Sequence, residues 1–158
     1  MEKVAQEIVD LMREKGLKLG AVESATGGLI SHLITAVPGC SDVYAGSVTT
    51  YSNEVKIKVA GVKAATIEKY GAVSAPVARQ MAAGGREILG VDICIADTGI
   101  AGPGGATETK PLGLFYLGLA VPDGVHTKKR IFKGTRKERQ MAAALAALGW
   151  VRDWLRKS

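Results

Sequence analysis

A serine beside two glycines is the first place where this chain could perform nucleophilic chemistry. The stretch Val22-Glu23-Ser24-Ala25-Thr26-Gly27-Gly28 is an apolar run that ends at a serine, crosses two glycines and continues as an amphipathic segment. This pattern predicts a strand, a tight turn and a helix start, where backbone N–H groups have no intrahelical partners. Ser24 is therefore either a nucleophile beside an oxyanion site or a helix cap, and capping is the commoner role of serine there.

A serine nucleophile needs a base, and the sequence offers lysine more readily than histidine. His32 lies two turns into the helix that follows the serine, and His126 begins a hairpin strand, so neither is well placed for a histidine triad. Lys56 falls in the first turn of a short capped helix, where the helix dipole would lower its pKa and make it a base. Tyr51, at the end of the preceding strand, could donate or relay a proton. The alternative is that Lys56 is an ordinary surface lysine.

A glycine-rich loop, Asp97-Thr98-Gly99-Ile100-Ala101-Gly102-Pro103-Gly104-Gly105-Ala106-Thr107, follows a buried strand and is the second candidate. Successive N–H groups in such a loop can converge on an anion. The loop lacks the Gly-Lys-Ser/Thr ending of a Walker A motif, and no Gly-x-Gly-x-x-Gly follows the first strand, which argues against a nicotinamide-dependent oxidoreductase. A flexible connection between strands is the alternative. Asp97 either orients the site or is solvated at the strand's exit.

The third candidate is a local excess of positive charge. The chain has 21 Lys and Arg against 15 Asp and Glu, and residues 128–139 hold seven of the cations and one acid, so the remainder is neutral. Arg136 and Arg139 lie on one face of the first turn of a helix, where cations are unfavourable unless an anion is bound. Helix N–H groups with two guanidiniums would suit a phosphate or carboxylate. The other cations, Lys128, Lys129, Arg130 and Lys133, read as solvated hairpin charges.

These residues must be positioned by an α/β fold. Apolar periodicity and turn residues predict a mixed β-sheet covered by helices on both faces, in one compact layered domain spanning residues 1–158. The adjacent glycines Gly84 and Gly85 inside a predicted helix indicate either a very close packing partner or a kink. The predicted helices cover residues 1–15, 26–37, 53–59, 64–70, 74–89 and 134–155, and the predicted strands cover 17–22, 43–51, 91–100, 112–121 and 125–132.

Composition restricts the setting in which this domain works. No apolar run is long enough to span a bilayer and no signal peptide begins the chain, so we expect a cytoplasmic protein without a membrane partner. Cys94 reads as a small buried hydrophobe, whereas only loop exposure suggests a reactive thiol at Cys40. No metal-ligand spacing is present. The last helix is apolar on two sides, which the first helix or a second copy could cover, and we expect a homo-oligomer.

Five motifs, in order, resemble the CinA C-terminal domain family over residues 19–148. They are Glu23-Ser24-Ala25-Thr26-Gly27-Gly28, Tyr51-Ser52-Asn53-Glu54-x-Lys56, Gly71-Ala72-Val73-Ser74, Thr98-Gly99-Ile100-Ala101-Gly102-Pro103-Gly104-Gly105 and Lys110-Pro111-Leu112-Gly113. The resemblance implies a compact α/β domain, often fused to a molybdopterin-binding-like domain that we expect to be absent here. It also implies a nicotinamide-nucleotide amidase, which hydrolyses nicotinamide mononucleotide to nicotinate mononucleotide and ammonia without a cofactor or metal.

The resemblance implies roles for matching residues. Ser24 would be the nucleophile, Lys56 the base and Tyr51 the active-site tyrosine, with Thr26 taking over the helix cap. The pattern Phe132-x-Gly134-x-Arg136-x-x-Arg139 also resembles the family's arginine-bearing helix start. Substrate would be held by Thr26, Gly27 and Gly28, whose N–H groups would hold the oxyanion, together with Thr98, Gly102, Gly104, Gly105, Arg136 and Arg139.

Two positions depart from the family pattern. Ala106 replaces a common glycine, and Asp97 stands where a small or apolar residue is expected, which could change substrate charge preference or weaken activity. Two other functions stay open. One is an amidase acting on another small amide. The other is a non-enzymatic module that binds nucleotides or nucleic acid through residues 128–139, with nucleic acid the less favoured partner.

Overall fold

A five-stranded mixed sheet is the centre of the computed structural model, which describes residues 1–158. The strand order is β2-β1-β3-β4-β5. Strand β1 (Leu19–Glu23) pairs in parallel with β2 (Tyr44–Thr49) and β3 (Ile93–Gly99), whereas β4 (Leu114–Val121) and β5 (Gly124–Ile131) extend the sheet in antiparallel fashion. The carboxyl ends of β1, β2 and β3 therefore meet at one edge.

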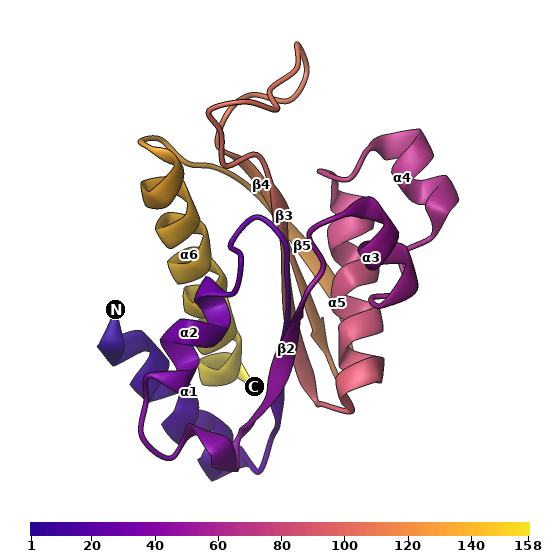
Figure 1. Ribbon diagram of the computed structural model, residues 1–158. Helices are drawn as coiled ribbons and strands as arrows, with labels where there is room; N and C mark the ends of the chain where they lie inside the picture. Colours follow the sequence, from indigo (N-terminus) through magenta and orange to yellow (C-terminus); the bar gives the residue numbers. More distant parts are fainter.

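Helices cover both faces of the sheet, which confirms the predicted fold class. One face carries α1 (Glu2–Lys15), α2 (Leu29–Thr35) and α6 (Arg136–Lys157), and the other carries α3 (Asn53–Lys58), α4 (Ala64–Tyr70) and α5 (Ala75–Leu89) (Figure 1). A single 3₁₀ turn, η1 (Cys40–Asp42), precedes β2. None of these helices is long and apolar enough to cross a lipid bilayer.

The alternation of side chains along β3 divides the core into two layers. Ile93 and Ile95 face α1, α2 and α6 in a cluster of 20 buried residues, whereas Cys94 and Ala96 face α5 in a cluster of 10. Both faces of a parallel sheet covered by helices are dry, which explains the near-continuous apolar run. Cys94 is the buried hydrophobe expected from its sequence, and burial raises the pKa of its thiol to about 12.

Helix α6 is covered on two sides within the chain. Its buried residues Ala143, Ala147 and Val151 belong to the cores beneath it, and α1 packs along its outer flank. Much of the apolar surface of α6 thus has partners in the same molecule, and α1 is one of them, which was one of the two sequence alternatives. The homo-oligomer stays a prediction.

Gly84 and Gly85 allow the backbone of α5 to lie very close to its neighbours. This agrees with the first of the two sequence alternatives, a close packing partner rather than a kink. A Cβ on Gly84 would lie 1.7 Å from the carbonyl oxygen of Ala60, and one on Gly85 would lie 2.2 Å from the side chain of Val22. Helix α5 therefore packs against the loop after α3 and against β1 with almost no space for side chains.

Three of the six helices begin at a side-chain cap. The hydroxyls of Ser52 and Ser74 accept the Val55 and Val77 N–H groups, and Thr135 forms a capping box with α6. Helix α2 has no such cap and begins at Leu29 rather than at the predicted residue 26. Residues 24–28 form an extended turn instead.

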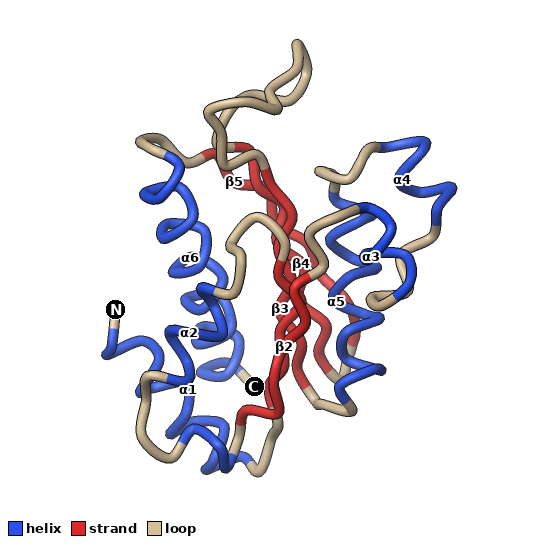
Figure 2. Tube along the Cα trace, viewed as in Figure 1, coloured by secondary structure: helices blue, strands red, loops and turns tan.

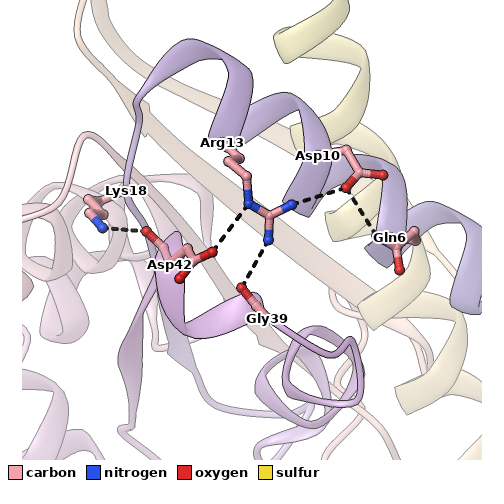
Figure 3. A network of polar contacts seen from close by, with 6 residues as sticks. All are labelled: Gln6, Asp10, Arg13, Lys18, Gly39 and Asp42. Atoms are coloured by element: carbon pink, nitrogen blue, oxygen red, sulfur yellow. Dashed lines mark hydrogen bonds and ion pairs between the residues drawn. The ribbon is translucent and has the colours of Figure 1, made fainter.

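The two ends of the sheet differ in character. At the amino end of the parallel strands, Arg13 donates to Asp42 at 3.3 Å and to the Gly39 carbonyl at 3.1 Å, which fixes the connection into β2 (Figure 3). At the opposite end, the loop between β3 and β4 projects beyond the sheet (Figures 1 and 2). The candidate chemistry lies at this second end.

Candidate active site

The loops that follow β1, β2 and β3 enclose a cleft of about 290 Å³. Strands β2 and β3 flank β1 on opposite sides, so the order of the parallel strands reverses at β1, and such switch points are the usual ligand sites of open α/β sheets. A larger hollow of about 580 Å³ lies between α1 and α2 but is lined by no candidate nucleophile or base. The cleft is lined by Ser24, Ala25, Tyr51, Asn53, Lys56, Ala72, Val73, Thr98, Gly99, Ile100, Ala101, Gly102, Gly104, Gly105 and Arg136.

Lys56 and Ser24 meet inside this cleft, although 32 positions separate them in the sequence. The Nζ of Lys56 lies 2.9 Å from the Oγ of Ser24, and the lysine is only 2% exposed. Ser24 is buried as well. The prediction that pairs this serine with this lysine agrees with the geometry, and the surface-lysine alternative is wrong.

Two main-chain carbonyls fix the orientation of the lysine amine. Lys56 Nζ lies 2.8 Å from the Thr50 carbonyl oxygen and 3.0 Å from that of Tyr51. A neutral amine has two hydrogens and one lone pair, so donation to both carbonyls directs the lone pair toward Ser24. In that state the Ser24 hydroxyl donates to Lys56, which is the arrangement required of a general base.

Burial is the main cause that lowers the pKa of Lys56, and the nearby charge of Asp97 acts in the opposite direction. The expected cause, the dipole at a helix N-terminus, is wrong because α3 has only six residues and Lys56 lies in its last turn. The direction of the shift is nevertheless the one that a lysine base needs at moderate pH.

Tyr51 contributes to the site through two different atoms. Its carbonyl binds Lys56, whereas its hydroxyl accepts a hydrogen bond of 2.8 Å from Nη2 of Arg136. The hydroxyl forms no hydrogen bond with Ser24 or Lys56, and the side chain is 58% exposed at the mouth of the cleft. This geometry favours a role in holding Arg136 over the expected role in proton relay.

Glu23, which sequence reasoning did not assign to the site, caps α2. Its buried carboxylate accepts the N–H groups of Gly28, Ile30 and Ser31 at 2.8–3.0 Å. The hydroxyl of Thr26 donates to the same carboxylate at 2.7 Å, so the expected helix-capping role of Thr26 is wrong. The only sequence signal was an acidic residue beside a predicted helix start.

The turn N–H groups expected to hold an oxyanion are already occupied. Thr26 N–H donates to Asp97, Gly27 N–H to the Ser24 carbonyl and Gly28 N–H to Glu23. None of these three residues lines the cleft. The Ala25 N–H, in contrast, lies next to the nucleophile in the cleft lining and makes no hydrogen bond within the chain. Ala25 therefore replaces Thr26, Gly27 and Gly28 as the candidate oxyanion donor.

Asp97 is buried behind the turn and is not a solvated group at the end of its strand. Its two oxygens accept the N–H groups of Ser24 and Thr26, each at 3.1 Å, and it also contacts the Thr26 hydroxyl. It does not line the cleft. The possibility that Asp97 changes substrate charge preference by facing the substrate is therefore not supported, and the alternative that it orients the site agrees with the structure.

The glycine loop lines the cleft and has N–H groups without a partner in the chain. Those of Gly102, Gly104 and Gly105 form no hydrogen bonds within the chain, as an anion-binding loop requires. Arg136 donates to the Gly102 carbonyl at 2.8 Å and stands at the cleft. Arg139 donates to the Ala101 carbonyl at 3.0 Å but does not reach the cleft, so the two arginines do not form the expected paired anion site.

Several other residues contribute in ways that their sequence pattern did not specify. Thr98 lines the cleft, but its hydroxyl donates to the Ala72 carbonyl at 2.8 Å, which joins β3 to the segment before α5. Gln140 donates to the Ala25 carbonyl at 2.8 Å and supports the turn from α6. The motif at residues 71–74 was the signal for Ala72 and Val73, which line the cleft.

The remaining cations do not converge on this cleft. Lys128 lies 4.5 Å from the ring centre of Trp150 in a cation–π contact, so it is not the freely solvated charge that was expected. Lys129, Arg130 and Lys133 are absent from the cleft lining. No three His, Cys, Asp or Glu side chains converge to hold a metal ion.

Together, these features define an α/β domain with a buried serine–lysine pair at the carboxyl edge of its parallel strands. The family model of the CinA C-terminal domain matches residues 1–155, and the chain belongs to this family. A CinA-like protein of Geobacter sulfurreducens is 46% identical over 145 residues, which cover 92% of this chain and 35% of that protein. A relative from Caldicellulosiruptor saccharolyticus, by name a competence-damage inducible protein, is 46% identical over 157 residues. This match covers 99% of the chain and 37% of that relative, so the chain spans little more than a third of both proteins' length.

Solved structures agree with the family assignment. A CinA superfamily protein from Klebsiella pneumoniae has a TM-score of 0.95 at 26% identity, with 99% of this chain and 98% of that chain covered. The competence/damage inducible protein CihA from Agrobacterium tumefaciens has a TM-score of 0.94 at 35% identity, with coverage of 98% and 94%. The five-stranded layered domain is thus the fold of this superfamily.

Proposed function

We propose that this domain is an amidase that hydrolyses the carboxamide of nicotinamide mononucleotide to nicotinate mononucleotide and ammonia. The observation that carries the proposal is the contact of 2.9 Å between Lys56 Nζ and Ser24 Oγ inside a cleft. A buried lysine whose amine hydrogens are directed to two carbonyls is suited to accept the serine proton. The resemblance to amidases of the CinA family supplies the expected substrate class.

The first half of the reaction forms an acyl-enzyme. Lys56 accepts the proton of Ser24 while Ser24 Oγ attacks the carboxamide carbon, and the carbonyl oxygen becomes an oxyanion. The Ala25 N–H is placed to donate to that oxyanion. Protonated Lys56 then returns its proton to the departing nitrogen, the C–N bond breaks, and ammonia leaves.

The second half uses the same base. Lys56 removes a proton from water, the hydroxide adds to the ester carbon, and the bond to Ser24 breaks as the serine recovers its proton. The products are a carboxylate and the free enzyme. Each step uses a proton already held by Ser24, Lys56 or water, so this scheme needs no redox partner.

The surroundings of the pair suit a phosphorylated substrate. Arg136 supplies a cation at the cleft, and the free N–H groups of Gly102, Gly104 and Gly105 supply donors on the same side. A nucleotide phosphate bound there would leave its base directed toward Ser24. Arg139 would act indirectly, by holding the Ala101 carbonyl and with it the loop.

Ammonia release from nicotinamide mononucleotide tests this proposal. Wild type should release ammonia, whereas Ser24→Ala and Lys56→Ala should each lose at least about a thousandfold in kcat, as expected when either member of a nucleophile–base pair is removed. Lys58→Ala is the matched control, since Lys58 lies on the same helix but is exposed and pairs with Glu54. Full activity in Ser24→Ala would rule out the covalent scheme.

The same experiment separates the two other candidates. Ammonia release from a different small amide, but not from the nucleotide, would assign the Ser24–Lys56 pair to another substrate. Absence of ammonia release together with steeply salt-dependent binding of DNA or RNA would favour the binding module.

A further inference from the structure

Two buried carboxylates lie side by side behind the nucleophile. Glu23 is the last residue of β1 and Asp97 belongs to β3, and the parallel register pairs Val22 with Ala96 immediately before them. Strand alternation puts both on the sheet face that carries α2 and α6. Both are fully buried, and neither lines the cleft. The proposed chemical steps use neither group.

Asp97 binds the main chain of Ser24, whereas Lys56 contacts its side chain from the cleft. The Asp97 carboxylate accepts Ser24 N–H, and Lys56 Nζ contacts Ser24 Oγ, so a single residue separates the acid from the base. A second hydrogen bond from Thr26 N–H fixes the carboxylate in the turn. Asp97 is therefore tied to the reacting pair by direct contacts, although it never touches the substrate.

We propose that Asp97 is a positioning residue that fixes the Ser24 turn and, through its negative charge, keeps Lys56 protonated to higher pH than an uncharged residue would. This inference rests on the proposed function only in taking neutral Lys56 as the active form. Asp97 thus opposes the effect of burial and raises the pH at which the lysine becomes a base. An uncharged residue at position 97 would let the pair work at lower pH.

No cation forms an ion pair with Asp97, and the charge of Asp97 favours the protonated form of Lys56. Asp97 accepts the N–H groups of Ser24 and Thr26 and contacts the Thr26 hydroxyl, and Glu23 is its one charged neighbour on the sheet. From α6, Arg136 and Arg139 direct their guanidiniums to the Gly102 and Ala101 carbonyls. The buried residues of α5 are apolar: Val77, Ala78, Met81, Ala82 and Gly85.

Burial determines when this charge is present. It raises the pKa of Asp97 to about 6, so the carboxylate is ionised above that pH and neutral below it. Around Lys56, the other titratable side chains in the cleft lining are the phenol of Tyr51 and the guanidinium of Arg136, which is hydrogen-bonded to that phenol. Charge interactions are strong in such a poorly solvated region, and an opposite charge nearby favours the charged form of lysine.

A titration of the Lys56 side chain tests the inference without any substrate. The protein is labelled with ¹⁵N-lysine, its Nζ resonances are followed by NMR across pH, and Lys56→Met identifies the Lys56 signal. In Asp97→Asn the Lys56 midpoint should fall by about one pH unit, a tenfold loss of proton affinity. The matched control is Asp92→Asn, which removes an equal charge at the other end of β3 and should leave the midpoint unchanged.

An unchanged Lys56 midpoint in Asp97→Asn would overturn the inference. If Asp97→Asn does not fold, Asp97→Ser provides a second uncharged variant whose hydroxyl can still accept one N–H group, and the same shift is expected. Ammonia release adds the kinetic readout, because the acid limb of kcat/KM should move with the NMR midpoint. A shifted midpoint without ammonia release would contradict the proposed substrate and support the role of Asp97. Ammonia release without a shifted midpoint would support the proposed substrate and contradict the role of Asp97.

Discussion

Arg136 and Tyr51 join two loops across the mouth of the cleft. Arg136 Nη2 donates to the Tyr51 hydroxyl at 2.8 Å, and its Nη1 donates to the Gly102 carbonyl at the same distance. The guanidinium therefore connects the loop after β2 to the glycine loop after β3. Its position is set by one side chain and one carbonyl, which makes the contribution of the tyrosine hydroxyl measurable.

Tyr51→Phe should weaken substrate binding more than it slows the chemistry. The substitution removes the hydroxyl that holds Arg136 but keeps the Tyr51 carbonyl that binds Lys56. We expect KM to rise about three- to tenfold, the effect of one hydrogen bond, with kcat nearly unchanged. Arg136→Ala should raise KM about a hundredfold because a charged donor is lost.

Steady-state ammonia release measures both effects, and Tyr70→Phe is the control. Tyr70 is likewise exposed, but its hydroxyl forms no hydrogen bond and the residue lies on α4. A large fall in kcat for Tyr51→Phe with KM unchanged would instead assign the hydroxyl to proton relay.

Glu23→Gln should destabilise the fold strongly. The Glu23 carboxylate accepts three backbone N–H groups and one hydroxyl at a buried position, and an amide would turn an NH₂ group toward some of these donors. We expect the free energy of unfolding to fall by about 2–4 kcal/mol, measured by urea denaturation. Glu54→Gln, at an exposed ion pair on α3, should change it by about 0.5 kcal/mol or less. Equal effects of the two substitutions would show that Glu23 is not the cap of α2.

The behaviour of this turn shows what the sequence could and could not predict. Ser52, Ser74 and Thr135 cap helices through N–H groups three residues away, and these helices begin close to the predicted residues 53, 74 and 134. Helix α2 is capped by Glu23 from outside the turn, through N–H groups five to eight residues ahead. A prediction based on a hydroxyl at the helix start therefore assigned the cap to Thr26. It placed the start of the helix at residue 26, three residues before the observed start at Leu29.

The candidate residues of the site could be predicted, but not the geometry that brings them together. Ser24, Lys56 and Arg136 lie in the turn after β1, on α3 and at the start of α6, and they meet at one cleft. Periodicity predicts strands but not their order, so the contact between Ser24 and Lys56 rested on the family resemblance. The sequence predicted that Asp97 either orients the site or is solvated at the end of its strand. These two roles could be distinguished only by knowing which face of β3 Asp97 occupies and which elements cover that face.

The stability of the protein should fall as pH rises through the range in which Asp97 ionises. The folded-state pKa of Asp97, about 6, lies above the ordinary value of 3.8, so the folded protein holds this proton more tightly than the unfolded chain does. The stabilisation is fully present below about pH 4 and is lost as pH rises through about 6. The difference between the two pKa values corresponds to about 3 kcal/mol.

Urea denaturation of wild type and Asp97→Asn at a series of pH values measures this effect. The free energy of unfolding of wild type should decline relative to the variant by about 3 kcal/mol between pH 4 and pH 7, since only wild type carries the titrating group. Parallel pH profiles in the two proteins would show that Asp97 is not the group that takes up the proton.

Gly84→Ala and Gly149→Ala should have opposite effects on stability, although both place an alanine inside a helix. Alanine favours a helix over glycine by about 1 kcal/mol, and this gain applies at Gly149 on α6, where a Cβ meets no atom within 4 Å. At Gly84 on α5 the same Cβ would lie 1.7 Å from the carbonyl oxygen of Ala60. The helix or the loop after α3 must then move, and the strain of overpacking exceeds the gain in helix propensity.

We therefore expect Gly149→Ala to raise the free energy of unfolding by about 0.5–1 kcal/mol and Gly84→Ala to lower it by about 2 kcal/mol or more. Urea denaturation of the pair against wild type gives both values. The Ala60 N–H donates a hydrogen bond to the Lys56 carbonyl at the end of α3. Displacement of this loop in Gly84→Ala should therefore move Lys56 and reduce ammonia release. Stabilisation by both substitutions would mean that α5 does not pack against this loop as closely as the structure has it, and that the placement of Lys56 does not depend on that contact.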